Sequence, residues 1–202
     1  YRNWGDHESL VTNHTVDAGG RTGVRWYEVR DPGGTPTMFQ ASTFTPDTTY
    51  RWMASITQDA SQNMALGFSK SDAASFPSIG IVGRLAGDAL NTMGNENIWF
   101  AGTGSQVSSF NRWGDYSSMS LDPVDECTFW YTQEYYATTT DFDFKTPRAA
   151  LLSTRSQPQS YAHAETELFD YPGDYLKKAD GEARVKMRLE ERQAEYQMVR
   201  AD

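Results

Sequence analysis

The residues of this chain best suited to chemistry are arginines placed directly before tryptophans. Arg51-Trp52 and Arg112-Trp113 occur in two similar phrases, and paired arginines commonly clamp a carboxylate. Tyr131, Glu134 and Asp115 would add a nucleophile, its partner and an acid, the residue types of a glycosidase acting on an acidic sugar. An arginine beside a tryptophan at repeated positions fits a structural stack equally well. We therefore assign no catalytic residue. The predicted binding positions are Arg51, Trp52, Arg112 and Trp113.

Three acidic residues in one short stretch, Asp122, Asp125 and Glu126, are the candidate metal ligands. Carboxylates this close could hold Ca²⁺ together with backbone carbonyls, although a polar hairpin turn explains them as well. The three histidines lie too far apart in the sequence for a zinc site. Apart from this Ca²⁺ site, we predict no cofactor.

Composition and charge exclude two classes of function. The 202 residues carry a net charge of -9, which disfavours a nucleic-acid partner because phosphate binding needs a basic surface. No run of about 20 apolar residues is present, so no membrane-spanning segment is predicted. Cys127 is the single cysteine, so we expect no intrachain disulfide and interpret it as a small buried residue. Since Tyr1 is preceded by neither a methionine nor a leader, we expect a processed or internal piece of a protein.

Short runs of β-branched and aromatic residues, separated by turn residues, predict strands up to about residue 136. The predicted strands are residues 24–29, 37–44, 54–58, 64–69, 78–84, 98–102, 117–121 and 128–135. The arginine–tryptophan phrase recurs near Arg2, Arg51 and Arg112, at about the spacing of propeller blades. An antiparallel sandwich in which the phrase recurs by chance is the alternative.

A different pattern begins near Thr140. Residues 141–144 alternate like a strand that ends at Pro147, and residues 151–159 are predicted as a polar connection. A short strand over 162–169 and a turn at Pro172-Gly173 precede a long helix capped by Asp180. The predicted fold class is therefore mainly β, with antiparallel propeller-like blades, followed by a short α+β segment with one long C-terminal helix. The predicted domains are residues 1–140, the β unit, and residues 141–202, the hub-like segment.

The β unit resembles a family of secreted bacterial proteins with propeller-type repeats over residues 1–136. The resemblance lies in Gly23-Val24-Arg25-Trp26-Tyr27-Glu28, Tyr50-Arg51-Trp52 and Ala65-Leu66-Gly67-Phe68. It implies secretion and no particular activity. It also implies a closing strand with a second cysteine, which this chain lacks. Some propellers with Ser-x-Asp turns are sialidases, and Ser120-Leu121-Asp122 is loosely similar, so a carbohydrate-binding or sialidase-like propeller is the alternative function.

The hub-like segment is similar to the type VI secretion spike protein VgrG and to the phage late-control D, or baseplate hub, family. The motifs are Asp141-Phe142-Asp143-Phe144, Asp170-Tyr171-Pro172-Gly173 and Arg188-Leu189-Glu190. The resemblance implies the base of a trimeric hub without catalytic residues, docking to neighbouring subunits.

Together these observations predict a non-enzymatic structural or interaction protein of bacterial origin, exported to the cell exterior. The expected partners are proteins, or further copies bound through the hub-like segment, with glycans as the alternative. A third hypothesis is that the two halves are an accidental or deliberate join near Thr140.

Overall fold

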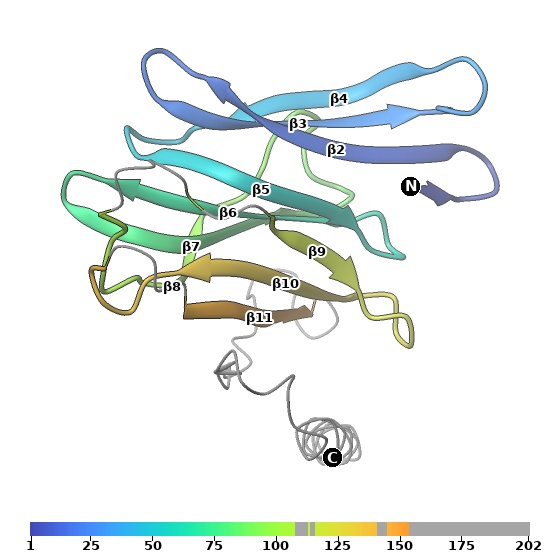
Figure 1. Cartoon of the computed structure of the whole chain (residues 1–202). Coiled ribbons are helices and arrows are strands. Elements are labelled where there is room, and N and C mark those ends of the chain that lie inside the picture. Colours follow the sequence, from blue (N-terminus) through green and yellow to red (C-terminus); the bar gives the residue numbers. More distant parts are fainter. Residues whose placement is uncertain (108–112, 114–115, 141–144, 154–202) are drawn as a thin grey trace. The chain divides into compact units, whose positions relative to one another are not determined.

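The computed structural model describes residues 1–107, 113, 116–140 and 145–153, and for 145–153 only the backbone (Figure 1). Every element in this described part is a β-strand, and the strands form three antiparallel sheets. Within these residues, no helix is long and apolar enough to cross a lipid bilayer. The chain divides into two compact bodies, Tyr1–Phe169 and Asp170–Asp202. The second body lies outside the described residues.

Each sheet is a meander in which strands that follow one another in the chain pair antiparallel. Sheet 1 contains β1 (Arg2–Asn3), β2 (Glu8–Asp17), β3 (Thr22–Arg30) and β4 (Thr37–Phe44). Sheet 2 contains β5 (Tyr50–Gln58), β6 (Met64–Asp72), β7 (Ser75–Arg84) and β8 (Asn97–Phe100). Sheet 3 contains β9 (Ser118–Leu121), β10 (Thr128–Tyr135) and β11 (Lys145–Ser153), in the order β11-β10-β9.

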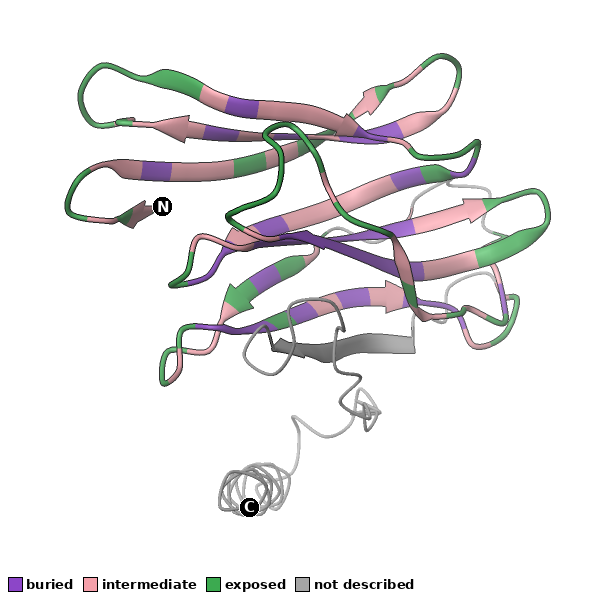
Figure 2. Cartoon of the chain, turned by 180° about the vertical axis from the view of Figure 1, so that it is seen from behind, coloured by how far each residue is buried: buried purple, intermediate pink, exposed green. Residues whose placement is uncertain are grey.

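Two apolar clusters hold the sheets together. In the first, Val24 and Trp26 of sheet 1 pack against Leu66 and Phe68 of sheet 2. In the second, other residues of sheet 2, such as Ile81, pack against sheet 3. Sheet 2 is thus the middle layer, and Figure 2 shows many buried residues on its strands. Burial of both faces of sheet 2 is the main stabilising term of this part of the molecule.

A bulge in β5 is held by polar side chains from both neighbouring sheets. The register with β6 shifts between Trp52 and Ser55, and Met53 has a φ of 48°. Its carbonyl accepts hydrogen bonds from Gln133 Nε2 at 2.7 Å and from Ser117 Oγ at 2.8 Å, both from the sheet 3 side. On the other side, with its amide flipped, Asn13 of β2 donates to the Ala54 carbonyl at 2.9 Å. The bulge therefore fixes how the three sheets pack.

Replacement of Gln133 by leucine should lower the free energy of unfolding by about 1–3 kcal/mol, because the Met53 carbonyl and the Tyr131 hydroxyl lose a buried donor. Urea denaturation monitored by tryptophan fluorescence measures the change. The half-buried Gln106 lies outside the named strands, and Gln106→Leu is the control, expected to change the free energy by less than about 0.5 kcal/mol. Equal losses for the two variants would contradict this role of Gln133.

The structure confirms the eight strands predicted up to residue 135, with shifted ends, and adds β1 and β2, which were not predicted. The predicted fold class is wrong, because the described residues are all-β and contain no helix. The long helix expected from Asp180 gains no support and lies outside the described residues, as do the strand over 162–169 and the turn at Pro172-Gly173. The propeller arrangement and the division after residue 140 stay predictions.

Pro147 does not end a strand as predicted, because β11 runs from Lys145 through it to Ser153. β11 lies at the edge of sheet 3, where a residue without an N–H can be accommodated. Of the predicted strand over 141–144, nothing lies within the described residues. The predicted polar connection at 151–159 begins inside β11.

Candidate functional site

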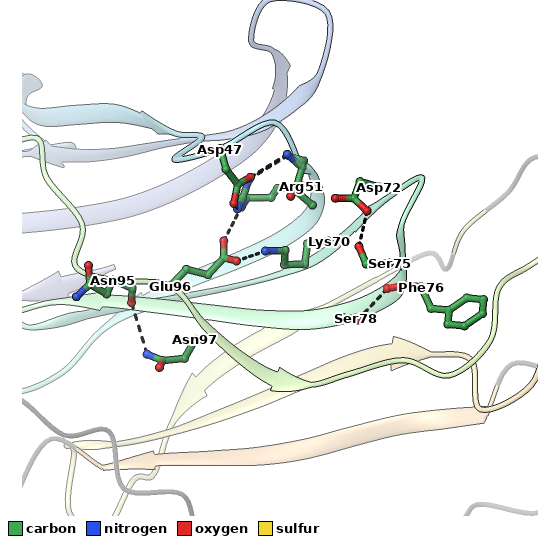
Figure 3. Close-up of polar contacts among 11 residues, drawn as sticks. Asp47, Arg51, Lys70, Asp72, Ser75, Phe76, Ser78, Asn95, Glu96 and Asn97 are labelled. Atoms are coloured by element: carbon green, nitrogen blue, oxygen red, sulfur yellow. Dashed lines mark hydrogen bonds and ion pairs between the residues drawn. The ribbon is translucent and has the colours of Figure 1, made fainter.

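Arg51, the first predicted binding residue, lies at the centre of an ion-pair network with Glu96, which is largely buried, and Asp47, which is half exposed (Figure 3). Its guanidinium is fully buried, between the rings of Phe44 and Phe68 at 5.5 and 5.8 Å. Asp47 comes from the connection between sheets 1 and 2, and Glu96 from the segment before β8. The network therefore joins segments that are far apart in the sequence.

The hydrogen bonds of Arg51 use each of its nitrogens. Nη1 and Nη2 donate to the two carboxylate oxygens of Asp47, each at 2.9 Å, which is a bidentate pair. Nη1 also donates to the Thr49 carbonyl at 2.9 Å, and Nε donates to Glu96 Oε2 at 2.6 Å. Lys70 of β6 forms an ion pair with the other oxygen of Glu96. A guanidinium held in this way stabilises the fold and is poorly placed to bind a ligand carboxylate.

The pKa values of this network follow from its contacts. Hydrogen bonds from Arg51 hold the pKa of the Asp47 carboxyl well below its usual range. Burial lowers the pKa of Arg51, but its hydrogen bonds to Asp47 and Glu96 outweigh that effect and raise the pKa overall. Both groups therefore stay charged around neutral pH.

Asp47 should make the stability of the protein dependent on acid pH. A carboxyl whose pKa is lower in the folded than in the unfolded state stabilises the fold above the unfolded pKa, and this contribution is lost as the pH falls through the folded pKa. We therefore expect Asp47→Asn to be less stable than the wild type near pH 7. Between about pH 5 and 2 it should lose stability less steeply. Thermal unfolding followed by circular dichroism across this range measures both effects.

The matched control for Asp47→Asn is Asp17→Asn, at the exposed end of β2. Asp17 Oδ1 accepts a hydrogen bond from the Gly20 N–H at 2.8 Å, and an asparagine oxygen can accept the same bond. The stability of this control should fall between about pH 5 and 2 as steeply as that of the wild type. If the stability of Asp47→Asn fell equally steeply, the ion pair would not be the source of the pH dependence.

The two predicted binding tryptophans contact each other. Trp52 and Trp113 pack edge to face with ring centroids 5.8 Å apart, and Trp113 also packs on Tyr136 at 5.4 Å. Both tryptophans are only partly exposed. The two tryptophans of the repeated phrase therefore pack on each other, whereas the Arg51 guanidinium lies over the rings of Phe44 and Phe68 and not over Trp52. Arg112, the fourth predicted binding residue, lies outside the described residues.

The described residues of the sialidase-like alternative do not form an open catalytic group. Tyr131 is fully buried, its hydroxyl accepts a hydrogen bond from Gln133 at 2.9 Å, and burial raises the pKa of its phenol far above the usual range. A nucleophilic tyrosine would need access to substrate and a lower pKa. Asp115 lies outside the described residues.

The three candidate metal ligands take part in the turn between β9 and β10. Asp122 accepts hydrogen bonds from the Val124 N–H and the Trp130 indole, and Asp125 accepts from Cys127, which is buried, and Thr128. Glu126 pairs with Arg2 at 2.6 Å. The part of the chain that the structure describes contains no group of three His, Cys, Asp or Glu side chains placed to hold a metal ion. The geometry favours the turn interpretation over Ca²⁺ binding.

Sequence reasoning missed a second buried polar cluster, between sheets 1 and 2. Glu28 of β3 is 1% exposed and accepts hydrogen bonds from Ser9 and Arg30, each at 3.2 Å, and from Gln40. Ser9 Oγ also lies 3.1 Å from Gln58 Oε1, across the interface between the sheets. The one available signal was a glutamate at an inward position of an alternating strand. These contacts give Glu28 a structural role.

Comparison with known proteins concerns the C-terminal third of the chain. Residues 134–202 match the model of the phage tail baseplate hub (GPD) family. This segment resembles a phage baseplate hub. The match begins at Glu134, inside β10, and so overlaps sheet 3. The propeller-type resemblance of residues 1–136 stays a prediction.

Three type VI secretion system spike proteins of Pseudomonas aeruginosa are similar to part of the chain. VgrG1b is 42% identical over 60 residues, which are 30% of this chain and 8% of the relative. VgrG1a is 38% identical over 63 residues, 31% of this chain and 10% of the relative. VgrG1c is 37% identical over 60 residues, 30% of this chain and 8% of the relative. The chain thus spans a small part of these relatives. No solved structure matches it.

Proposed function

We propose that this chain is a non-enzymatic structural component of a bacterial type VI secretion spike. In this proposal, the hub-like segment docks onto further copies or other spike subunits, and the β unit is a propeller-like module carried with it to the cell exterior. The observation that carries the proposal is the match of residues 134–202 to the baseplate hub family, together with the similar spike proteins.

The geometry around the start of the match supports a firm connection between the two parts. β11 pairs with β10 from Thr128 to Tyr135, so residues 145–153 of the hub-like segment complete sheet 3. Residues 136–140 are also hydrogen-bonded to the chain after β8, for example through Gly104 N–H to the Tyr136 carbonyl at 3.0 Å. The β unit and residues 145–153 of the hub-like segment therefore share one sheet.

The absence of an enzyme activity is part of the proposal. The similar proteins are spike proteins by name. Among the described candidates for chemistry, the Arg51 guanidinium and the Tyr131 hydroxyl are buried and hydrogen-bonded within the fold. Neither observation favours the carbohydrate-directed alternative.

Export in bacteria with and without a working type VI secretion system tests the proposal. A tagged full chain should appear in the medium of the competent cells and stay inside cells in which the system is inactivated. Replacing Pro172-Gly173 by two alanines should abolish export, because it removes the residues suited to the turn of the hub motif. Pro158→Ala, in the polar stretch, is the control and should be exported. Equal export from both kinds of cell would overturn the proposal.

A further inference from the structure

Part of the outer face of sheet 1 is cationic, although the protein as a whole is acidic. Val24 and Trp26 of β3 face sheet 2, so the residues that alternate with them face away from it. The outer face of sheet 1 includes Glu8, Leu10, Thr12, His14, Arg25, Tyr27, Val29 and Thr43. Its carboxylate, Glu8, lies at the other end of β2 from His14 and Arg25 and accepts hydrogen bonds from the Tyr1 hydroxyl and the Gly33 N–H. The part of this face formed by His14, Arg25 and Tyr27 therefore carries a cation and no carboxylate, although the net charge of the chain is -9.

This face is ordered around one aromatic ring. His14 stacks on Tyr27 with the centroids 5.5 Å apart, and the Arg25 guanidinium lies 5.3 Å from the same ring. Arg25 also donates to Thr43 Oγ1 at 3.3 Å. These contacts hold side chains of three strands against one another, so little side-chain entropy would be lost when a partner docks.

The corresponding faces of the other two sheets are already interfaces. In sheet 2 the middle strand β6 directs Leu66 and Phe68 toward sheet 1, and in sheet 3 the middle strand β10 directs Phe129 and Tyr131 toward sheet 2. Tyr27 has the same place on the middle strand of its own three-strand meander. The same kind of contact therefore occurs twice, between sheets 2 and 1 and between sheets 3 and 2. Among the described residues, the equivalent face of sheet 1, which carries Tyr27, has no sheet packed on it.

At the opposite end of the stack of sheets, the described residues of β9 and β10 present the other half of that contact. Phe129 and Tyr131 face sheet 2, so Trp130 and Thr132 face outward, beside the exposed Ser118 and Ser120. Trp130 is 41% exposed, and its indole N–H donates to an oxygen of Asp122 at 3.2 Å. The outer face of sheet 3 thus offers an aromatic ring with a carboxylate at its edge, which is a suitable site for a guanidinium.

We propose that a second copy of this chain docks head to tail, with the outer face of its sheet 3 on the outer face of sheet 1. Arg25 of one copy lies against Trp130 and Asp122 of the other. Two copies joined through like faces would place Arg25 against Arg25, so charge favours the head-to-tail arrangement. This contact is separate from any assembly through the hub-like segment.

The test measures the mass of the full chain by sedimentation velocity over a range of concentrations. Arg25→Glu should weaken association through this face by about tenfold or more, because one interface anchor is lost and a repelling charge is introduced. Trp130→Ala should weaken it similarly from the other side. Assembly through the hub-like segment would persist in both variants. The experiment therefore distinguishes a failure of the proposed function from a failure of the contact between sheets 1 and 3.

Arg21→Glu is the matched control. Arg21 donates to Thr45 Oγ1 at 2.9 Å, much as Arg25 donates to Thr43, but it lies in the turn before β3. This variant makes the same charge change and loses the same kind of bond, and it should associate like the wild type. Circular dichroism checks that all three variants keep their strands.

Mixing the two interface variants separates the head-to-tail contact from others. Arg25→Glu keeps an intact sheet 3 face, and Trp130→Ala keeps an intact sheet 1 face. An equimolar mixture should therefore regain one contact and show a higher mass than either variant alone. If the masses of wild type, Arg25→Glu and Trp130→Ala are the same, or if the mixture regains nothing, the proposal is overturned.

Discussion

Arg51→Met is expected to lower the free energy of unfolding by about 3 kcal/mol, near the lower end of the cost of breaking a buried ion pair, because Glu96 is largely buried whereas Asp47 is half exposed. Glu96, which is 11% exposed, would keep Lys70 but lose the Nε bond of 2.6 Å. Asp47 would lose both hydrogen bonds from the guanidinium, although its Oδ1 would keep the Thr49 N–H at 2.8 Å, and the Thr49 carbonyl would lose a donor. Methionine can fill the space between Phe44 and Phe68, so the loss reports charge and hydrogen bonding more than volume.

Urea denaturation of Arg51→Met, Arg51→Lys and Arg21→Met measures this contribution. Lysine keeps the charge but cannot form the bidentate pair with Asp47, so its loss should be intermediate. Arg21, in a turn with one threonine partner, is the control and should cost less than about 1 kcal/mol. A loss for Arg51→Met as small as that of the control would show that the network contributes little to stability.

The strands were predictable where their two faces differ in polarity. β3 and β10 alternate between buried and partly exposed residues along most of their length, and such a pattern identifies a strand from sequence alone. β2 was missed because its inward positions include Ser9 and Asn13, polar residues that hydrogen-bond across the interface between sheets 1 and 2. When inward positions are occupied by polar residues that hydrogen-bond to a distant strand, the sequence does not show the alternation of apolar and polar residues that identifies a strand.

The candidate site was predictable in its residue types but not in its contacts. Arg51 was identified by its repeated position, whereas Glu96, its partner 45 residues away, lies in a polar segment without a distinguishing pattern. The contact between Trp52 and Trp113 joins equivalent places in the repeat, but it was not predicted, because the sequence does not show which side chains of separate sheets meet. The match that begins at Glu134, inside β10, could not be located so early from the motifs, because residues 134–140 are used by sheet 3 and its neighbouring segment.

Gly67→Ala should destabilise the protein by about 3 kcal/mol, because the close approach of sheets 2 and 3 leaves no room for a methyl group. A Cβ built on Gly67 would lie 2.4 Å from two ring atoms of Tyr131 and 2.7 Å from a third. Tyr131 is fully buried, and its hydroxyl is held by Gln133. The ring cannot therefore swing away as the end of a flexible side chain could, and one sheet must shift against the other.

A double-mutant cycle in urea decides whether this contact is the cause. In a Tyr131→Val background the ring atoms are absent, so adding Gly67→Ala should cost less than about 1 kcal/mol, and the two effects should be strongly non-additive. Gly87→Ala is the matched control: an added Cβ there meets nothing within 4 Å, and its effect should stay within about 0.5 kcal/mol. Additive losses in the cycle would mean that Gly67 is needed for the conformation of β6 itself. Strong coupling would instead show that the missing side chain at Gly67 sets the distance between sheets 2 and 3.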